Sequence, residues 1–225
     1  MQEHPEDLVQ TLCHHYSPER INLGNLCDSL IPETVTGFHD LSYLFACHQA
    51  NRGGIAQDFD EAAYTWKVIT LKQPARLLEI GCWLGGSTIL HAAAAMSYGG
   101  ILESVDLKVK MPGYADDELI RSHLKRVNLN NVTMSIGDSR TFVPKKQLQY
   151  VFIDGDHSYE GVKSDYENVL QYLDIGADVL FHDACQAREF ATIHEPVSRF
   201  IQEVKGSATV QFEREVGSIC HFTVI

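Results

Sequence analysis

From residue 76 onward, segments typical of buried strands alternate with segments typical of amphipathic helices. A strand, a helix and a second strand in succession form a parallel pair, because the helix carries the chain back along the sheet. The sequence therefore predicts an α/β fold with a doubly wound sheet. Seven strands are expected, at residues 76–80, 101–106, 132–137, 149–154, 177–182, 208–213 and 217–224.

The last two predicted strands are connected differently from the others. Only Arg214, Glu215 and Val216 lie between the two, which is too short for a helical crossover. Two strands joined by so short a turn pair antiparallel. We therefore expect a mostly parallel sheet that ends in an antiparallel C-terminal hairpin.

The first 60 residues lack the alternation. Apolar residues at 38, 41, 44 and 45 indicate a helix, and Gly53-Gly54 marks a joint before a further helix at about 60–72. We expect a helical extension over residues 1–60, lying on the carboxyl edge of the sheet, and an α/β domain over residues 61–225.

Charge and hydropathy limit the partners of the chain. Its formal net charge is −12 at pH 7 and no basic cluster stands out, which argues against DNA or RNA as a partner. Its apolar runs are shorter than a membrane span, and its acidic first residues do not resemble a signal peptide. We therefore expect a cytoplasmic protein that acts on a small molecule and not on a membrane, with a homodimer as the default assembly.

A loop rich in glycine follows the first predicted strand, where residues 78–88 read Leu-Glu-Ile-Gly-Cys-Trp-Leu-Gly-Gly-Ser-Thr. Gly81, Gly85 and Gly86 lack a Cβ, so the chain can turn at positive φ and a ligand can approach the backbone. The spacing matches neither the dinucleotide motif nor the phosphate loop, which favours a nucleoside with an amino acid over a pyrophosphate. A tight strand-to-helix connection is the alternative.

Acidic residues lie at or near the ends of five predicted strands. Ligands of such sheets bind at the carboxyl ends of the strands, and clustered carboxylates repel unless cations or hydrogen-bond donors lie between them. Asp106 is placed to accept from two ribose hydroxyls, with a cap as the alternative. Asp138 or Ser139 could bond an adenine, with a plain turn equally expected. The five are Glu79, Asp106, Asp138, Asp154 and Asp183.

The fourth and fifth predicted strands deliver the densest group of chemically active side chains. The fourth ends in Asp154 and is followed by Asp156 and His157, and the fifth ends in His182 and is followed by Asp183. Asp154, His182 and Asp183 could converge on a divalent cation. Oxygen ligands favour Mg²⁺, whereas an imidazole in the set makes Mn²⁺ or Fe²⁺ competitive.

From about residue 62 to its end, the chain resembles class I S-adenosylmethionine-dependent methyltransferases, and among them small-molecule O-methyltransferases of the catechol and antibiotic-sugar types. The segment Glu79-Ile80-Gly81 with Gly85 and Ser87 is similar to the cofactor loop of the catechol enzyme. The segment 152–156, Phe-Ile-Asp-Gly-Asp, is similar to the metal-binding strand end of the sugar enzymes.

This resemblance implies roles for individual residues. Gly81, Trp83 and Ser87 would line the methionine part of the cofactor, Asp106 would hold the ribose, and Ser139 would lie by the adenine. The full set of expected cofactor contacts is Glu79, Gly81, Trp83, Gly85, Ser87, Asp106, Asp138, Ser139 and Asp154.

The resemblance also implies a first metal ligand, Asp154, and two candidate catalytic bases. His157 falls where the catechol enzyme has its general-base lysine, and Asp156 falls where the sugar enzymes have a base aspartate. After the fifth strand, the families have Asp-Asn or Asp-Asp, whereas this chain reads His182-Asp183-Ala184. One family ligand is therefore replaced, by either His182 or Ala184 depending on the alignment, whereas Asp154 and Asp183 are kept in both. The expected metal ligands are Asp154, His182 and Asp183.

These patterns favour methylation of a small-molecule hydroxyl by S-adenosylmethionine with help from a divalent cation. Two alternatives stay open: an oxidative enzyme similar to cephalosporin hydroxylases, which share the sheet and an Asp-x-Asp-His segment, and a non-catalytic nucleoside-binding protein on the same fold. Oxygen-dependent product without S-adenosylhomocysteine would identify the first. The base candidates beside the metal residues count against the second.

Overall fold

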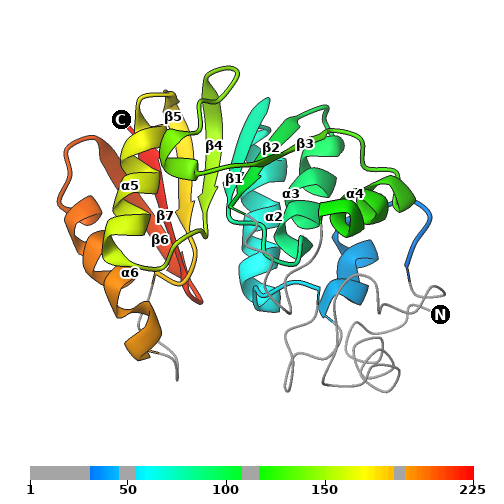
Figure 1. Cartoon of the computed structure of the whole chain (residues 1–225), viewed down its shortest axis with the longest axis horizontal. Coiled ribbons are helices and arrows are strands. Elements are labelled where there is room, and N and C mark those ends of the chain that lie inside the picture. The colour runs from blue at the N-terminus through cyan, green and yellow to red at the C-terminus, as the bar shows by residue number, and fades with distance from the viewer. Residues whose placement is uncertain (1–30, 46–53, 108–116, 185–190) are drawn as a thin grey trace.

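The computed structural model describes residues 31–45, 54–107, 117–184 and 191–225, apart from the side chains of residues 191–194. Its centre is a seven-stranded sheet in the order β3-β2-β1-β4-β5-β7-β6 (Figure 1). Strands β1 to β5 are parallel, whereas β7 is antiparallel to both β5 and β6. The predicted fold class is confirmed. The strands are β1 Arg76–Ile80, β2 Ile101–Asp106, β3 Val132–Ile136, β4 Leu148–Ile153, β5 Leu173–Phe181, β6 Val210–Val216 and β7 Ile219–Val224.

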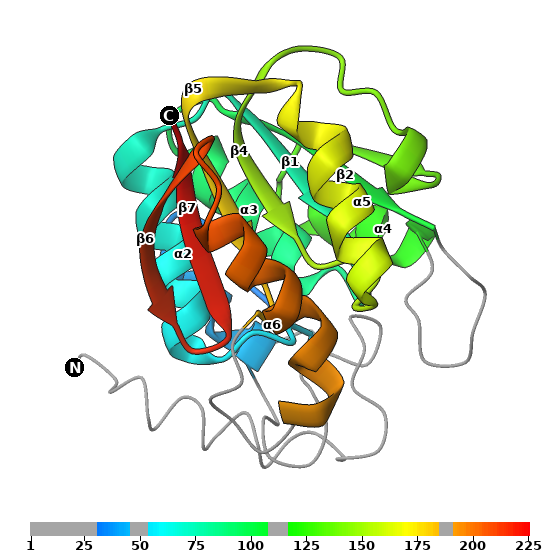
Figure 2. The ribbon, with the colours of Figure 1, turned by 90° about the vertical axis from the view of Figure 1, so that its left-hand side faces the viewer.

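Helices cover both faces of this sheet (Figure 2). Because side chains alternate along a strand, Leu77 of β1 packs toward α2 and α3, whereas Leu78 and Ile80 pack toward α5 and α6. Two hydrophobic clusters result, one on each face. The described helices are α2 Phe59–Lys72, α3 Gly86–Met96, α4 Asp117–Arg126, α5 Tyr159–Leu170 and α6 Ala191–Lys205, with 3-10 helices η3 Phe38–Phe45 and η4 Ser139–Thr141.

The largest differences from the predicted strand boundaries lie at the start of β5 and at the hairpin turn. Strand β5 begins at Leu173, four residues early, because Leu173 pairs with Leu148 before an irregularity at which Gly176 takes a φ of 85°. The hairpin turn lies at Gly217-Ser218, since Glu215 and Val216 still pair with β7. Gly217 has a φ of 58°, a conformation that suits glycine in a tight turn.

The described part of the N-terminal region packs beside α3 and α4. The apolar residues at 38–45 form the 3-10 helix η3, and the Tyr43 hydroxyl lies 2.7 Å from Nε2 of His123 in α4. The amide of Ile55 donates to the carbonyl of Leu44 at 3.2 Å. The rest of the predicted extension, residues 1–30 and 46–53, lies outside the described residues. Among the described helices, none has the length and apolar character needed to cross a membrane.

The Tyr43–His123 hydrogen bond supports a prediction about stability. Burial lowers the pKa of His123 to about 4, so at neutral pH its imidazole is uncharged and can accept from Tyr43. Replacing Tyr43 with Phe leaves that buried nitrogen without its partner, and we expect the free energy of unfolding to fall by about 1–2 kcal/mol. Urea denaturation at neutral pH measures the change. Tyr159→Phe, which removes an exposed hydrogen bond to Glu203, should have a smaller effect, and equal losses would contradict the prediction.

Candidate active site

The candidate site lies at the carboxyl ends of β1, β4 and β5, which are neighbours in the sheet. Hydrogen bonding continues past the strand ends: Asp154 donates its amide to the Ile80 carbonyl at 2.8 Å, and His182 donates its amide to the Ile153 carbonyl at 3.0 Å. The first residues after β4 and β5 are therefore as firmly placed as the strands themselves. Their side chains converge at this edge.

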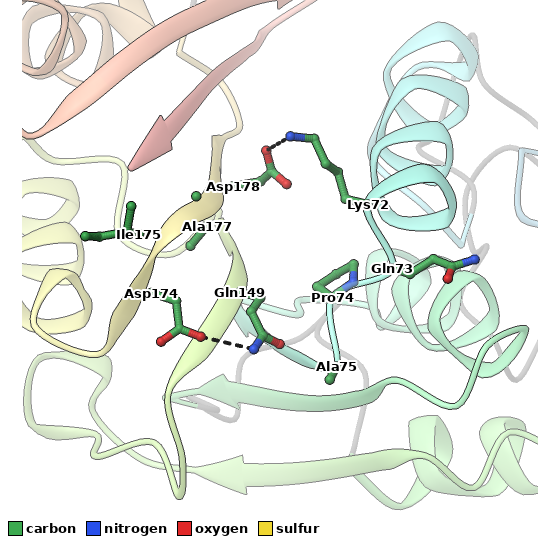
Figure 3. Close-up of a pocket in the computed structure, with 10 residues that line it drawn as sticks. Lys72, Gln73, Pro74, Ala75, Gln149, Asp174, Ile175, Ala177 and Asp178 are labelled. Atoms are coloured by element: carbon green, nitrogen blue, oxygen red, sulfur yellow. Dashed lines mark hydrogen bonds and ion pairs between the residues drawn. The ribbon is translucent and has the colours of Figure 1, made fainter. Parts of the chain in front are cut away.

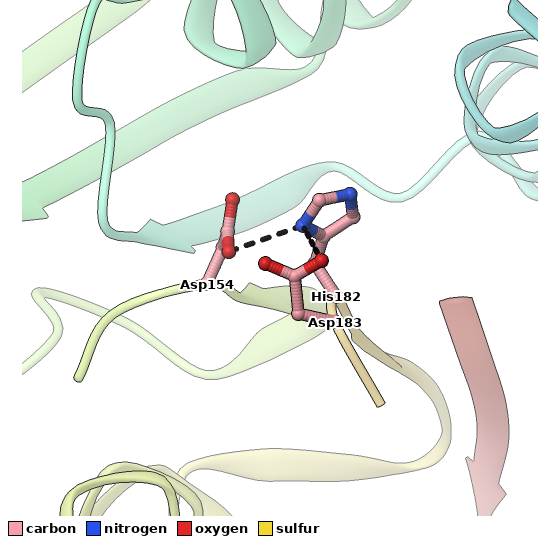
Figure 4. Close-up of side chains that lie close together, drawn as sticks. All are labelled: Asp154, His182 and Asp183. Atoms are coloured by element: carbon pink, nitrogen blue, oxygen red, sulfur yellow. Dashed lines mark hydrogen bonds and ion pairs between the residues drawn. The ribbon is translucent and has the colours of Figure 1, made fainter. Parts of the chain in front are cut away.

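Asp154, His182 and Asp183 face one another, as Figure 4 shows. Oδ1 of Asp154 lies 3.2 Å from Nδ1 of His182, and the same nitrogen lies 3.6 Å from Oδ1 of Asp183. One ligand atom from each of the three lies within 4.8 Å of the others. His157 joins the group, with Nε2 at 3.1 Å from Asp154 and Nδ1 at 3.6 Å from Asp183. Two carboxylate oxygens and one imidazole nitrogen make a donor set that fits a divalent cation.

Charge attraction within the cluster outweighs the cost of burying it. Burial acts to raise the pKa of Asp154, but the adjacent imidazoles of His182 and His157 hold it well below the usual value. Burial acts to lower the pKa of His182, yet Asp154, Asp183 and Glu61 raise it well above the usual value. The hydrogen bond to Asp154 raises the pKa of His157. The cluster therefore behaves as a coupled set of opposite charges that a cation would rearrange.

The glycine loop after β1 lies directly against this cluster. Gly81 and Gly85 have φ values of 84° and 86°, which allows the predicted turns. The space where their Cβ atoms would be is filled by protein, however: the carbonyl of Asp154 lies against Gly81, the side chain of Ile120 against Gly85, and the carbonyl of Gly54 against Gly86. The glycines thus allow other segments of the protein to pack closely against the loop, whether or not the loop also binds a ligand.

Asp106, at the end of β2, fixes the conformation of the same loop. Its Oδ2 accepts from the amides of Cys82 at 2.8 Å and Trp83 at 3.1 Å. These bonds hold Trp83 at a φ of 36°, which is uncommon for a residue with a side chain. The carboxylate predicted to hold a ribose is therefore adjacent to the glycine loop and shapes it.

Comparison with known proteins agrees with this geometry. Residues 78–184 match the family model of a methyltransferase domain. Over these residues the chain matches methyltransferase domains, and its strand order is that of the class I methyltransferase fold. The predicted family and enzyme class are confirmed at that level, and the matched span includes both the glycine loop and the Asp154–His182–Asp183 cluster.

Several solved methyltransferases share the fold. An SAH-bound methyltransferase from Podospora anserina is 12% identical, with 100% of this chain and 97% of that chain covered and a TM-score of 0.67. An O-methyltransferase from Bacillus cereus in complex with SAH is 20% identical, covering 75% and 84%, with a TM-score of 0.57. An O-methyltransferase of tomaymycin synthesis from Streptomyces achromogenes, in complex with SAM, is 20% identical, covering 72% and 78%, with a TM-score of 0.54.

Not all of the predicted site residues of this methyltransferase domain reach the crevice. Glu79 is fully buried beneath α3, where it accepts from Thr88 at 2.5 Å and Ser104 at 2.7 Å and lies 3.3 Å from His91. It faces that way because Leu78 and Ile80, its neighbours in β1, face the other side. Glu79 therefore stabilises the layer between β1 and α3 and is not placed to contact a cofactor.

The segment after β3 is organised by local bonds. Asp138 caps η4, accepts from the amide of Arg140 at 3.0 Å and pairs with its guanidinium at 2.6 Å, as the turn alternative expects. The Ser139 hydroxyl donates to the buried Asp165 of α5 at 2.6 Å. Asp156 bends toward the start of α5, where it accepts from the Ser158 amide at 2.9 Å and lies against Gly161. Of the two base candidates, His157 contacts the cluster and Asp156 faces α5.

Glu61 is a member of the site that sequence reasoning missed. It lies in the first turn of α2, is 3% exposed, and its Oε2 lies 3.4 Å from Nε2 of His182. The available signal was Asp58-x-x-Glu61 before an apolar run, a capping box. That pattern is present, since the Asp58 amide donates to Glu61 at 2.8 Å. The pattern accounts for a helix start and gives no hint of the contact with His182.

Asp183 has a strained backbone that the C-terminal hairpin supports. Its φ is 52°, in the left-handed region. Its amide donates to the hydroxyl of Ser218 at 3.3 Å, and the next amide, of Ala184, donates to the carbonyl of Ser218 at 2.8 Å. The hairpin turn thus holds Asp183 toward Asp154 and His182.

A separate pocket of about 460 Å³ opens at the opposite edge of the sheet, at the amino ends of β1, β4 and β5 (Figure 3). Four of its polar side chains form two pairs: Lys72 lies 3.7 Å from Asp178, and Gln149 donates to Asp174 at 3.0 Å. The length of the strands separates it from the cluster at the carboxyl edge, so it is not part of the candidate active site.

The buried Asp165 leads to a pH-dependent prediction. Burial raises the pKa of Asp165 from 3.8 to about 6 despite its bond from Ser139. Between those values the folded protein keeps a proton that the unfolded chain releases, so stability from this group is present at low pH and is lost as pH rises through 6. Asp165→Asn should therefore match the parent near pH 4 and exceed its unfolding free energy by about 1–3 kcal/mol at pH 7.

Urea denaturation of both proteins across this pH range gives the difference in unfolding free energy directly. Because His123 and the other titrating groups are common to both, their contributions cancel. A difference that stays constant with pH would show that Asp165 does not titrate in this range.

Proposed function

We propose that this protein transfers a methyl group from S-adenosylmethionine to a hydroxyl oxygen of a small molecule, with a divalent cation held by Asp154, His182 and Asp183. The observation that carries the proposal is the packing of the glycine loop on the cluster, since Gly81 lies against the carbonyl of Asp154. A cofactor on that loop would have its sulfonium beside the place where the cluster holds an acceptor.

The loop residues are proposed to bind and orient the cofactor, whose sulfonium supplies the methyl group. Gly81, Trp83 and Ser87 would contact its methionine part. Asp106 would accept from the ribose while it maintains the loop through Cys82 and Trp83. Ser139 would lie by the adenine, held in place by Asp165. Much of the rate acceleration would come from holding two reactants in line.

Asp154, His182 and Asp183 would hold the cation, which supplies Lewis acidity that lowers the pKa of an acceptor hydroxyl and orients it. His157 is proposed as the general base that takes the hydroxyl proton on its uncharged imidazole, and in the structure its Nε2 lies 3.1 Å from Oδ1 of Asp154. Asp156 is the weaker candidate because its carboxylate binds the start of α5.

A specific observation favours a second candidate function. The nitrogen of His182 in the donor set would also suit iron, as expected of an oxidative enzyme similar to cephalosporin hydroxylases. Such an enzyme would consume oxygen and form product without S-adenosylhomocysteine. The contact between the glycine loop and the cluster favours methyl transfer over this alternative.

Calorimetric titration tests the proposal before any acceptor is known. The full chain is titrated with S-adenosylmethionine and S-adenosylhomocysteine, with Mg²⁺ or Mn²⁺ present and after chelation. We expect micromolar binding of both. Binding of neither under any condition would refute the proposal.

Asp154→Ala should separate cofactor binding from cation chemistry. We expect S-adenosylhomocysteine affinity to stay within about threefold, because Gly81 packs on the backbone carbonyl of Asp154, which the substitution keeps. Turnover with phenol, catechol or sugar acceptors found by a screen for S-adenosylhomocysteine release should fall by about 100-fold or more. Unchanged turnover would remove the cation site from the mechanism.

A matched pair of neighbouring substitutions tests the base. His157→Gln should lower turnover by about 100-fold or more, whereas Asp156→Asn should change it only a few-fold. Because the bond to Asp154 raises the pKa of His157 and a base has to be uncharged, turnover of the parent should rise with pH, and the rise should be centred above the pKa of an ordinary imidazole. This rise should be absent in His157→Gln. The reverse order of effects would assign the base to Asp156.

A further inference from the structure

We propose that Glu61 is a positioning residue, which holds the imidazole of His182 with Nδ1 turned toward Asp154 and Asp183 so that His182 binds the cation through nitrogen. This inference rests on the cation site of the proposed function. It assigns a role at that site to α2, an element that precedes the sheet in the chain.

The two nitrogens of His182 face different partners. Nε2 lies 3.4 Å from Oε2 of Glu61, whereas Nδ1 lies 3.2 Å from Asp154 and 3.6 Å from Asp183. An imidazole that keeps its Nε2 proton against a carboxylate directs the lone pair of Nδ1 to a metal. The arrangement is therefore that of a histidine ligand with a carboxylate behind it.

The imidazole has little freedom to turn away from this orientation. His182 is 5% exposed, and the ring of Phe152 packs beside it with centroids 5.9 Å apart. The orientation of the ring is then decided by which groups accept or donate at its two nitrogens. At Nε2 that group is Glu61.

Glu61 is itself held more firmly than a helix cap requires. Its Oε1 accepts from the Ser218 amide at 2.6 Å, and its Oε2 accepts from the Asp58 amide at 2.8 Å. Gly217 leaves the room that the carboxylate occupies, since a Cβ there would collide with it. A capping box needs only the bond to Asp58, and its carboxylate can be exposed to water. The carboxylate of Glu61 is buried, and the imidazole of His182 that it faces offsets the cost of burying its charge.

The identity of the cation gives a readout that a merely structural role would not move. Mn²⁺ accepts an imidazole nitrogen readily, whereas Mg²⁺ depends mainly on oxygen ligands. If Glu61 acts by presenting Nδ1 of His182, its loss should weaken binding of Mn²⁺ more than binding of Mg²⁺. General loosening of the site would weaken both alike.

The experiment is titration of the full chain with Mn²⁺, followed by electron paramagnetic resonance of the free ion, and with Mg²⁺ by calorimetry, without cofactor or acceptor. In Glu61→Gln, the amide oxygen can still accept from Ser218, but the amide nitrogen then donates toward Nε2, which places the imidazole proton on Nδ1. We expect Mn²⁺ affinity to fall about 10- to 100-fold and Mg²⁺ affinity to fall less than about threefold.

Asp58→Ala is the matched control, because it removes the other half of the capping box and leaves Glu61 beside His182. It should keep the Mn²⁺ affinity of the parent. In a double-mutant cycle, Glu61→Gln should have no further effect once His182 is Ala. Circular dichroism confirms that each variant is folded.

Several outcomes would overturn the inference: parental Mn²⁺ affinity in Glu61→Gln, an equal loss for both cations, the same loss in Asp58→Ala, or a parent that binds neither cation. The last would also remove the cation from the proposed function. Failure to bind S-adenosylmethionine together with the predicted Mn²⁺ pattern would refute methyl transfer and leave the role of Glu61 standing.

Discussion

Parallel pairing of β4 between β1 and β5 is the constraint on which the site depends. The order of strands reverses between β1 and β4, and at such a point the connecting segments diverge to opposite faces and leave a crevice at the carboxyl edge. The glycine loop, Asp154 and the pair His182-Asp183 are the segments that leave these three strands. They lie close together because β4 is hydrogen-bonded to both β1 and β5. The local sequence decides only which side chains these segments carry.

Much of this could be predicted because its signals are local. Seven apolar segments, the short final turn and the acidic residues after β4 and β5 are all visible in short windows of sequence, and the adjacency of the carboxyl ends follows from the fold class. The burial of Glu79 could also have been predicted from the alternation of side chains along a strand. This residue lies inside β1 and not after it, so the two-residue period of a strand turns it away from the faces of Leu78 and Ile80.

The contributions that could not be predicted come from contacts between distant segments. Glu61 reaches His182 only because α2 packs against the sheet, and Ser218 reaches Asp183 only because β7 pairs with β5. Several glycines belong to the same class: Gly155 makes room for Asp165, Gly161 for Asp156, and Gly217 for Glu61. A sequence shows that such a position lacks a side chain, but not which carboxylate fills the space.

The bonds of Ser218 have a thermodynamic consequence. This one residue donates its amide to Glu61 and accepts from the amides of Asp183 and Ala184, so the hairpin turn, the start of α2 and the left-handed residue of the cluster share a single junction. A ligand that binds only the assembled cluster must then favour the docked forms of all three segments by mass action. Ligand binding at the site would therefore be coupled to the docking of α2 and of the C-terminal hairpin, which lie far apart in the chain.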